Sequence, residues 1–276
     1  MLKTRIITAA VLSLGFLSAL FLASSNGWAL LTLSVTLIAT WEWSKLLKLN
    51  NQQMLCNLAA ILSVCLLAVF ISSEVLVAKY PILALLIIGL AAIFWVLFAP
   101  IWLARRWKIE NKLIMSILGI VLLSATWIAF NALRNESAWL LLSVIGAVSL
   151  ADSAAYFAGK RFGRHKLAPE ISPGKTWEGV AGAIVAGTFY GFLLCYFTHH
   201  SVWLIAGIWG IVLFSIMGDL FESLLKRQAD VKDSSHLLPG HGGVLDRIDG
   251  LIPALPLALF FVLIAKYFHL TSVIAH

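Results

Sequence analysis

Apolar residues recur along this chain in runs of about 20, and short polar stretches separate the runs. As a helix, each run is long enough to cross a bilayer core of roughly 30 Å. The pattern predicts nine spans, at approximately residues 5–24, 27–43, 54–72, 80–99, 112–131, 137–158, 178–198, 202–220 and 251–271. We therefore expect an all-α fold, a polytopic transmembrane helical bundle.

The composition agrees with a membrane protein. Of 276 residues, 61% are hydrophobic and 12% are charged, which is more apolar surface than one soluble core can shelter. No linker is long enough to separate domains. We expect one integral unit in which residues 1–135 form scaffold helices, with lipid access as a further role, and residues 136–276 carry the active site.

The basic residues predict an orientation. All of the 20 Lys and Arg residues except Lys79, Arg134 and Lys266 lie at the N-terminus or in loops that follow even-numbered spans. By the positive-inside rule, the N-terminus is cytoplasmic and the C-terminus lies outside, as in a plasma (inner) membrane protein. The net charge of +7 then reflects the cytoplasmic face and anionic lipid headgroups, and we expect no nucleic-acid partner.

Polar side chains concentrate in the second half of the chain. On a helix, Asp219, Glu222, Ser223 and Lys226 share one face. Asp246 and Asp249 have the same three-residue spacing. Two carboxylate pairs near basic residues suit Mg²⁺ held between the protein and a polyphosphate. For a single pair, simple ion pairing with Lys226, Arg227 and Arg247 is the better interpretation, whereas the whole cluster favours the metal site.

Other polar residues have two interpretations each. Lys175, in the turn-rich stretch 172–179, is either a phosphate ligand or a basic anchor at the membrane surface. His236 and His241 are phosphate ligands, proton carriers or interfacial histidines. His241 precedes Gly242-Gly243, where the backbone can turn sharply and offer N–H groups to an anion.

Two carboxylates fall within or beside apolar spans. Asp152 lies inside one, so it is expected to face a polar interior or a partner. Glu42 stands between Trp41 and Trp43 at a predicted membrane boundary, and we interpret it as an interfacial carboxylate in preference to a site residue. A stripe of small residues, Gly179, Ala183, Gly187 and Gly191, predicts close packing of the seventh span against its neighbours.

A cationic pocket with carboxylates at the cytoplasmic interface suggests chemistry between a soluble polyphosphate and a lipid headgroup. Phosphoryl and nucleotidyl transfer depend mainly on positioning and charge neutralisation. These residues do not select the base or the lipid.

The segment from Ser223 to Asp249 resembles the signature of the phosphatidate cytidylyltransferases, or CDP-diacylglycerol synthases. The signature has a serine, then Lys-Arg, Lys-Asp, His-Gly-Gly and finally Asp-Arg-hydrophobic-Asp, and this chain supplies each element. The similarity extends over about 140–255 and includes residues 172–179 and Gly218-Asp219.

The resemblance implies that CTP and phosphatidic acid give CDP-diacylglycerol and pyrophosphate, with Mg²⁺ required. On this basis we assign metal binding to Asp219, Asp246 and Asp249, and neutralisation of the triphosphate to Lys226 and Arg227. Catalytic roles are expected for Lys226, Arg227, Asp246 and Asp249, and CTP or phosphate contacts also for Lys175, Ser223, His241 and Arg247.

Two other classes of function remain open at this point. A CTP-dependent membrane lipid kinase would give a lipid monophosphate and CDP. In a transporter, Asp152 and Asp219 would line a permeation path. The sequence also leaves open whether the protein is a homodimer, and whether residues 221–250 form a loop or continue the eighth helix.

Overall fold

The structure is a computed structural model, and it describes residues 2–70, 88–198, 202–238 and 242–274. Its elements, in chain order, are α1 (Leu2–Leu22), α2 (Ser25–Leu46), α3 (Asn51–Phe70), the π-helical turn η1 (Phe94–Phe98), α6 (Ala99–Arg105), α7 (Lys112–Glu136), α8 (Ala138–Phe162), β1 (Lys166–Ala168), β2 (Ser172–Thr176), α9 (Trp177–Thr198), α10 (Trp203–Gln228), α11 (Leu245–Ile248) and α12 (Leu251–Ile274).

A helix overlaps each of the nine predicted spans, although part of the fourth range lies outside the described residues. Within the described residues, five helices are long and apolar enough to cross a membrane, namely Ile88–Arg105, α7, α8, α9 and α10. Shorter apolar stretches occur at Ser13–Leu22, Asn51–Leu67 and Leu251–Tyr267. The chain is therefore a mostly helical membrane protein, and nine spans with a cytoplasmic N-terminus remain a prediction.

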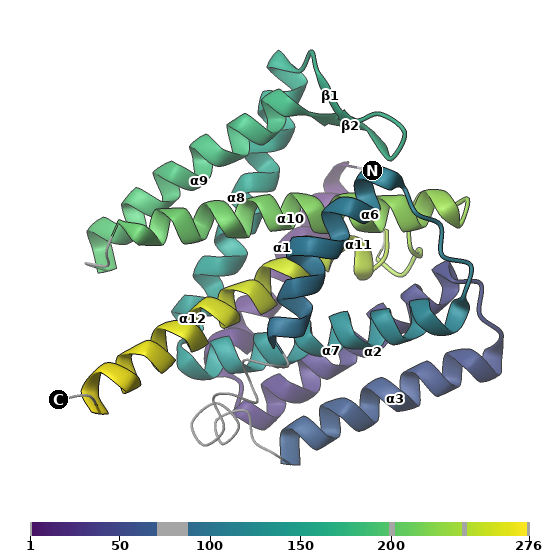
Figure 1. Cartoon of the computed structure of the whole chain (residues 1–276), viewed down its shortest axis with the longest axis horizontal. Helices are drawn as coiled ribbons and strands as arrows, with labels where there is room; N and C mark the ends of the chain where they lie inside the picture. The colour runs from purple at the N-terminus through teal and green to yellow at the C-terminus, as the bar shows by residue number, and fades with distance from the viewer. Residues whose placement is uncertain (1, 71–87, 199–201, 239–241, 275–276) are drawn as a thin grey trace.

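Helix α10 runs through the middle of the molecule (Figure 1). Helix α9 lies on one side of it, and α8, which packs closely against α9, crosses α10 and extends toward α7. On the other side, α7 packs against α2, α3 and α12. The described C-terminal half of α10 thus lies between the two groups of helices, which is where the polar residues gather.

The small-residue stripe packs as predicted. Gly179, Ala183, Gly187 and Gly191 are the buried residues of α9. A Cβ atom at Gly179 would lie 2.9 Å from the carbonyl oxygen of Ala155 on α8, and one at Gly191 would lie 3.0 Å from the side chain of Ile205 on α10. Such close backbone approach is how helices associate in lipid, where apolar burial gives little driving force.

The all-α prediction is wrong in one detail, because β1 and β2 form a small antiparallel ribbon. Lys166 pairs with Thr176, and Ala168 pairs with Ser172. Pro173 and Gly174 disfavour helix at this point, and the strands are too short and polar to show the alternation that predicts a sheet. The Thr176 hydroxyl then accepts a hydrogen bond from the Gly179 N–H (3.1 Å), which begins α9 directly after the ribbon.

A cluster of aromatic rings fixes the rotation of α10. Phe221 is 2% exposed, and the rings of Trp43, Phe94, Trp95 and Trp102 surround it at centroid distances of 5.4 to 6.5 Å. Asp219 precedes Phe221 by two positions, and residues two positions apart on a helix differ by about 200° in direction. Burying Phe221 on this side therefore turns Asp219 toward the opposite face of α10.

Replacing a glycine at the α9–α10 contact will weaken the bundle. We expect Gly191→Leu to lower the free energy of unfolding by about 1–3 kcal/mol, because the new side chain overpacks a filled contact. The matched control is Gly207→Leu on α10, where a Cβ atom meets nothing within 4 Å. The measurement is the thermal unfolding midpoint in detergent, and equal midpoints for the two variants would contradict this packing.

Candidate active site

A polar cavity of about 570 Å³ lies between α8, the β1–β2 ribbon, α10 and α11. Its charged lining residues are Asp152, Lys160, Lys175, Asp219, Lys226, Asp233, Asp246, Arg247 and Asp249. These residues come from segments between positions 152 and 249, which is the half of the chain that the sequence predicts to carry the site. The volume is in the usual range for small-molecule sites.

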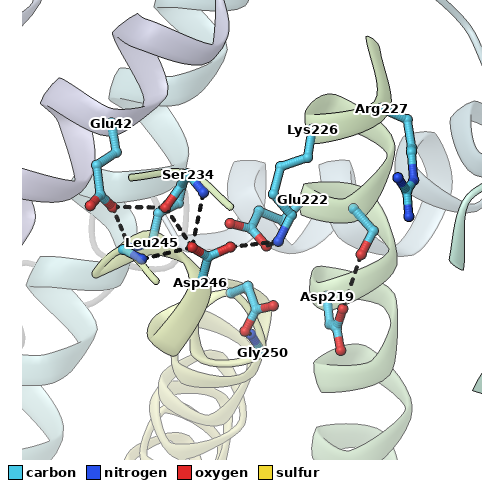
Figure 2. Close-up of polar contacts among 12 residues, drawn as sticks. Glu42, Asp219, Glu222, Lys226, Arg227, Ser234, Leu245, Asp246 and Gly250 are labelled. Atoms are coloured by element: carbon cyan, nitrogen blue, oxygen red, sulfur yellow. Dashed lines mark hydrogen bonds and ion pairs between the residues drawn. The ribbon is translucent and has the colours of Figure 1, made fainter. Parts of the chain in front are cut away.

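Lys226 and Asp246 form the most closely connected charged pair of the site (Figure 2). The Lys226 Nζ atom lies 2.5 Å from Asp246 Oδ1 and 2.6 Å from Glu222 Oε2. Glu222 is 3% exposed, and apart from this ion pair neither of its oxygens has a hydrogen-bond partner. Lys226 therefore links α10 to α11 while it neutralises a buried carboxylate on its own helix.

The other oxygen of Asp246 organises the loop that precedes α11. Asp246 Oδ2 accepts hydrogen bonds from the backbone N–H groups of Ser234 (2.9 Å) and Gly243 (2.8 Å), and from the Ser234 hydroxyl (2.9 Å). Burial alone would raise the pKa of Asp246, but the hydrogen bonds from Lys226, Gly243 and Ser234 outweigh it and lower this pKa to about 2. The carboxylate is thus ionised at neutral pH.

The structure answers the question of residues 221–250. Helix α10 continues to Gln228, and the chain then leaves the helix at Asp230, whose φ is 62°. The described residues 231–238 and 242–244 are irregular, with a bridge between Leu238 and Gly242, and they precede the single turn of α11. Gly242 has a φ of 78°, a conformation that glycine adopts without strain. The sharp turn predicted at Gly242-Gly243 is thus confirmed at Gly242, while His241 lies outside the described residues.

A second group of charges surrounds Asp219. Lys175 Nζ on β2 lies 2.6 Å from Asp219 Oδ2, and the Ser223 hydroxyl donates to Asp219 Oδ1 (3.3 Å). Asp249 follows α11 and accepts from the Gly250 N–H (2.8 Å). Burial, together with the negative charge of Asp219 nearby, raises the pKa of Asp249. Two carboxylates in one cavity thus repel each other, which favours a cation between them.

Most of the predicted site residues meet in this cavity. Lys175, Asp219, Lys226, Asp246, Arg247 and Asp249 all line it, and Ser223 touches Asp219. Arg227 is not among the lining residues: its side chain is exposed and donates from Nε to the carbonyl oxygen of Ile171 (3.3 Å), directly before the ribbon strand β2. His236 is exposed, and His241 lies outside the described residues.

The cavity is not cationic, which corrects the expectation from the sequence. Its described lining carries four cations, namely Lys160, Lys175, Lys226 and Arg247, against the five aspartates named above. The expectation from the sequence included every basic residue of the loops, but Arg227 and Lys232 are not among the residues that line the cavity. A triphosphate would need additional positive charge here.

The donor set fits a hard cation, although it is not arranged around one. Among the described residues, no three His, Cys, Asp or Glu side chains converge closely enough to hold a metal ion. Asp219 and Asp249 nevertheless line one cavity, and the nearby Glu222 carboxylate is buried with Lys226 as its one described partner. Carboxylate oxygens are the ligands that Mg²⁺ prefers.

Sequence reasoning missed Glu42. The side chain is 0% exposed, so its interpretation as an interfacial carboxylate is wrong. It accepts hydrogen bonds from the backbone N–H groups of Val244 (3.0 Å) and Leu245 (2.6 Å) and from the hydroxyls of Ser234 and Ser235. The available signal was the one applied to Asp152, namely that a carboxylate near an apolar span needs an internal partner.

Comparisons with known proteins identify the family of this chain. Residues 3–265 match the Cytidylyltransferase family. A phosphatidate cytidylyltransferase from Haemophilus influenzae is 36% identical, covering 95% of this chain and 98% of the relative. Those from Pseudomonas aeruginosa and Brucella suis are 37% and 33% identical and cover 93% and 94% of this chain, and 95% and 93% of the relatives. The chain belongs to the phosphatidate cytidylyltransferase family.

Asp246 is expected to hold the loop in place through its charge. In Asp246→Asn, the amide cannot accept from Lys226 and from the loop N–H groups at once, so the segment 229–238 should open more often. We expect amide hydrogen exchange in that segment to be about tenfold faster, since hydrogen bonds to charged acceptors contribute about 1.5–3 kcal/mol. Asp230→Asn, at an exposed position, is the control. Exchange at the wild-type rate in Asp246→Asn would contradict the role of the charge.

Proposed function

We propose that this protein transfers the cytidylyl group of CTP to phosphatidic acid, giving CDP-diacylglycerol and pyrophosphate. The observation that carries the proposal is the similarity over nearly the whole chain to phosphatidate cytidylyltransferases. The cavity adds physical support, because lysines and aspartates from α8, β2, α10 and α11 line one space that is large enough for a small polar ligand. Such a set suits positioning and charge neutralisation at phosphates.

The proposed reaction requires little acid–base chemistry from the protein. A phosphate oxygen of phosphatidic acid attacks the α-phosphorus of CTP, the bond to the β-phosphate oxygen breaks, and pyrophosphate leaves. The nucleophile is already ionised at neutral pH, so no general base is assigned. Lys175, Lys226 and Arg247 line the cavity and are placed to bind the phosphate oxygens and to neutralise the charge of the leaving group.

Lys175 and Lys226 both have carboxylate partners. Lys175 lies against Asp219, and Lys226 lies between Asp246 and Glu222. We propose that binding of a triphosphate draws these ammonium groups toward phosphate oxygens. Asp219 and Asp249, with Asp246 through its Oδ1 atom, would then hold Mg²⁺. When bound, Mg²⁺ would neutralise the triphosphate and polarise it for attack.

The finer assignments belong to the same proposal. The protein is an integral membrane protein, and the distribution of Lys and Arg supports a plasma (inner) membrane location with the site facing the cytoplasm. CTP would then arrive from the cytoplasm and phosphatidic acid from the bilayer. The N-terminal helices serve as the scaffold. A homodimer is the assembly to test.

The activity is tested with purified protein in micelles of detergent and phosphatidic acid, with Mg²⁺ and CTP labelled in the cytosine ring. We expect label to enter the lipid together with an equal amount of pyrophosphate. Asp249→Asn should reduce turnover at least about 100-fold, whereas the exposed control Asp230→Asn should not. CTP binding without label in the lipid would instead favour a lipid kinase, which needs a lipid alcohol as acceptor, and no CTP binding at all would leave a transporter.

Lys226 and Arg227 are adjacent in sequence but differ in their position relative to the cavity. We expect Lys226→Gln to lower kcat at least about tenfold more than Arg227→Gln, because only Lys226 lines the cavity. Steady-state kinetics with CTP and phosphatidic acid measure the difference. An equal loss of kcat in both variants would show that Arg227 reaches the substrate after a rearrangement of the ribbon.

A further inference from the structure

Glu42 belongs to α2, in the half of the chain that carries no other described part of the site, yet its carboxylate contacts the loop before α11 (Figure 2). The interaction spans about 200 residues of sequence. Oε1 accepts from the Val244 N–H and the Ser235 hydroxyl, and Oε2 accepts from the Leu245 N–H and the Ser234 hydroxyl. Every hydrogen bond that the structure gives this carboxylate therefore comes from residues 234–245.

Burying a carboxylate in this way contributes little to the stability of the fold. A fully buried carboxylate loses its hydration, and within the described residues no cation forms an ion pair with Glu42. Well-packed apolar residues in such a place are often as stabilising as buried charge or more so. What the carboxylate supplies instead is geometry, because four donors must converge on its two oxygens.

Ser234 connects this carboxylate to the active site. Its hydroxyl oxygen lies 3.2 Å from Glu42 Oε2 and 2.9 Å from Asp246 Oδ2. A hydroxyl has one hydrogen, which these two carboxylates share, so Ser234 couples the position of Glu42 to that of Asp246. Asp246 in turn binds Lys226, which lines the cavity.

Gly243 shows how closely the loop approaches Glu42. A Cβ atom there would lie 2.5 Å from Glu42 Oε1 and 2.0 Å from the Ser234 hydroxyl oxygen. No side chain fits without displacing one of these groups. The second glycine of the Gly242-Gly243 pair is thus required by the contact with Glu42, and not by an unusual backbone angle.

We infer that Glu42 is a positioning residue for the transfer reaction, which sets the placement of Asp246 and Lys226 by holding the loop through Val244, Leu245 and Ser234. Glu42 does not line the cavity, so it acts through these residues and not on the substrate. This inference rests on the proposed function for the assay used to test it.

The principal variant is Glu42→Gln, which keeps the size of the side chain and replaces one of its two acceptor oxygens by an NH₂ group. Each carboxylate oxygen accepts from one hydroxyl and one backbone N–H, so in either orientation the amide NH₂ faces a backbone N–H that can only donate, that of Val244 or that of Leu245. We expect kcat to fall about 10–100-fold while the KM for CTP changes less than about threefold, as is common for residues that orient catalytic groups. The Mg²⁺ concentration for half-maximal rate should rise. Glu110→Gln, at an exposed position, is the matched control.

A second variant covers the case in which Glu42→Gln does not fold. Ser234→Ala leaves the Val244 and Leu245 N–H groups on Glu42 but removes the hydroxyl between Glu42 and Asp246, and we expect a fall in kcat of about tenfold. Where both variants fold, the double variant should be no slower than the slower single variant, because the two residues act in one network.

The outcomes separate the inference from the proposed function. Absence of transfer by the wild-type protein would overturn the proposed function itself. Transfer by the wild type with unchanged kcat in folded Glu42→Gln or Ser234→Ala would overturn the positioning role alone. Losses that multiply in the double variant would overturn the shared network. Folding is monitored by the thermal unfolding midpoint of each variant in the same detergent.

Discussion

The site depends on one buried ammonium group. Lys226 lies between Glu222 on its own helix and Asp246 on the next, and it offsets the cost of burying Glu222, whose oxygens have no other partner among the described residues. The pair joins the end of α10 to the start of α11, although an irregular segment separates these elements in the chain. Its position follows from the aromatic cluster around Phe221, which sets the rotation of α10 and therefore the direction of its polar face.

The two halves of the chain contribute differently to this arrangement. The described cavity lining comes from the second half, where close packing of α8, α9 and α10 brings Asp152, Lys175 and Asp219 together. The first half contributes supports. Trp43 packs near Phe221, and its neighbour Glu42 holds the loop before α11. Trp43 thus supports α10, which carries Lys226, and Glu42 supports the start of α11, which carries Asp246.

Much of this could be predicted from the sequence, for identifiable reasons. Apolar runs and four-residue spacing depend on local periodicity, so the helices, the α9 stripe and the shared face of Asp219, Ser223 and Lys226 were accessible. The partner of Glu42 was not, because it lies about 200 residues away and only tertiary packing brings them together. The direction of Arg227 was equally hidden: adjacent residues on a helix differ by about 100°, and packing decides which of them faces the cavity.

The charge of the cavity places a constraint on any phosphate chemistry there. Five aspartates oppose four cations in the described lining, so a triphosphate would meet more repulsion than attraction if it came alone. The paired lysines reduce this repulsion only by leaving their carboxylates, which would expose Asp219 and Asp246 to each other and to Asp249. A divalent cation bound with the nucleotide would ease both difficulties, since it would neutralise the phosphates and the released aspartates. Lys175 and Lys226 form ion pairs with two of the carboxylates that such a metal would need, so its binding would require these lysines to shift.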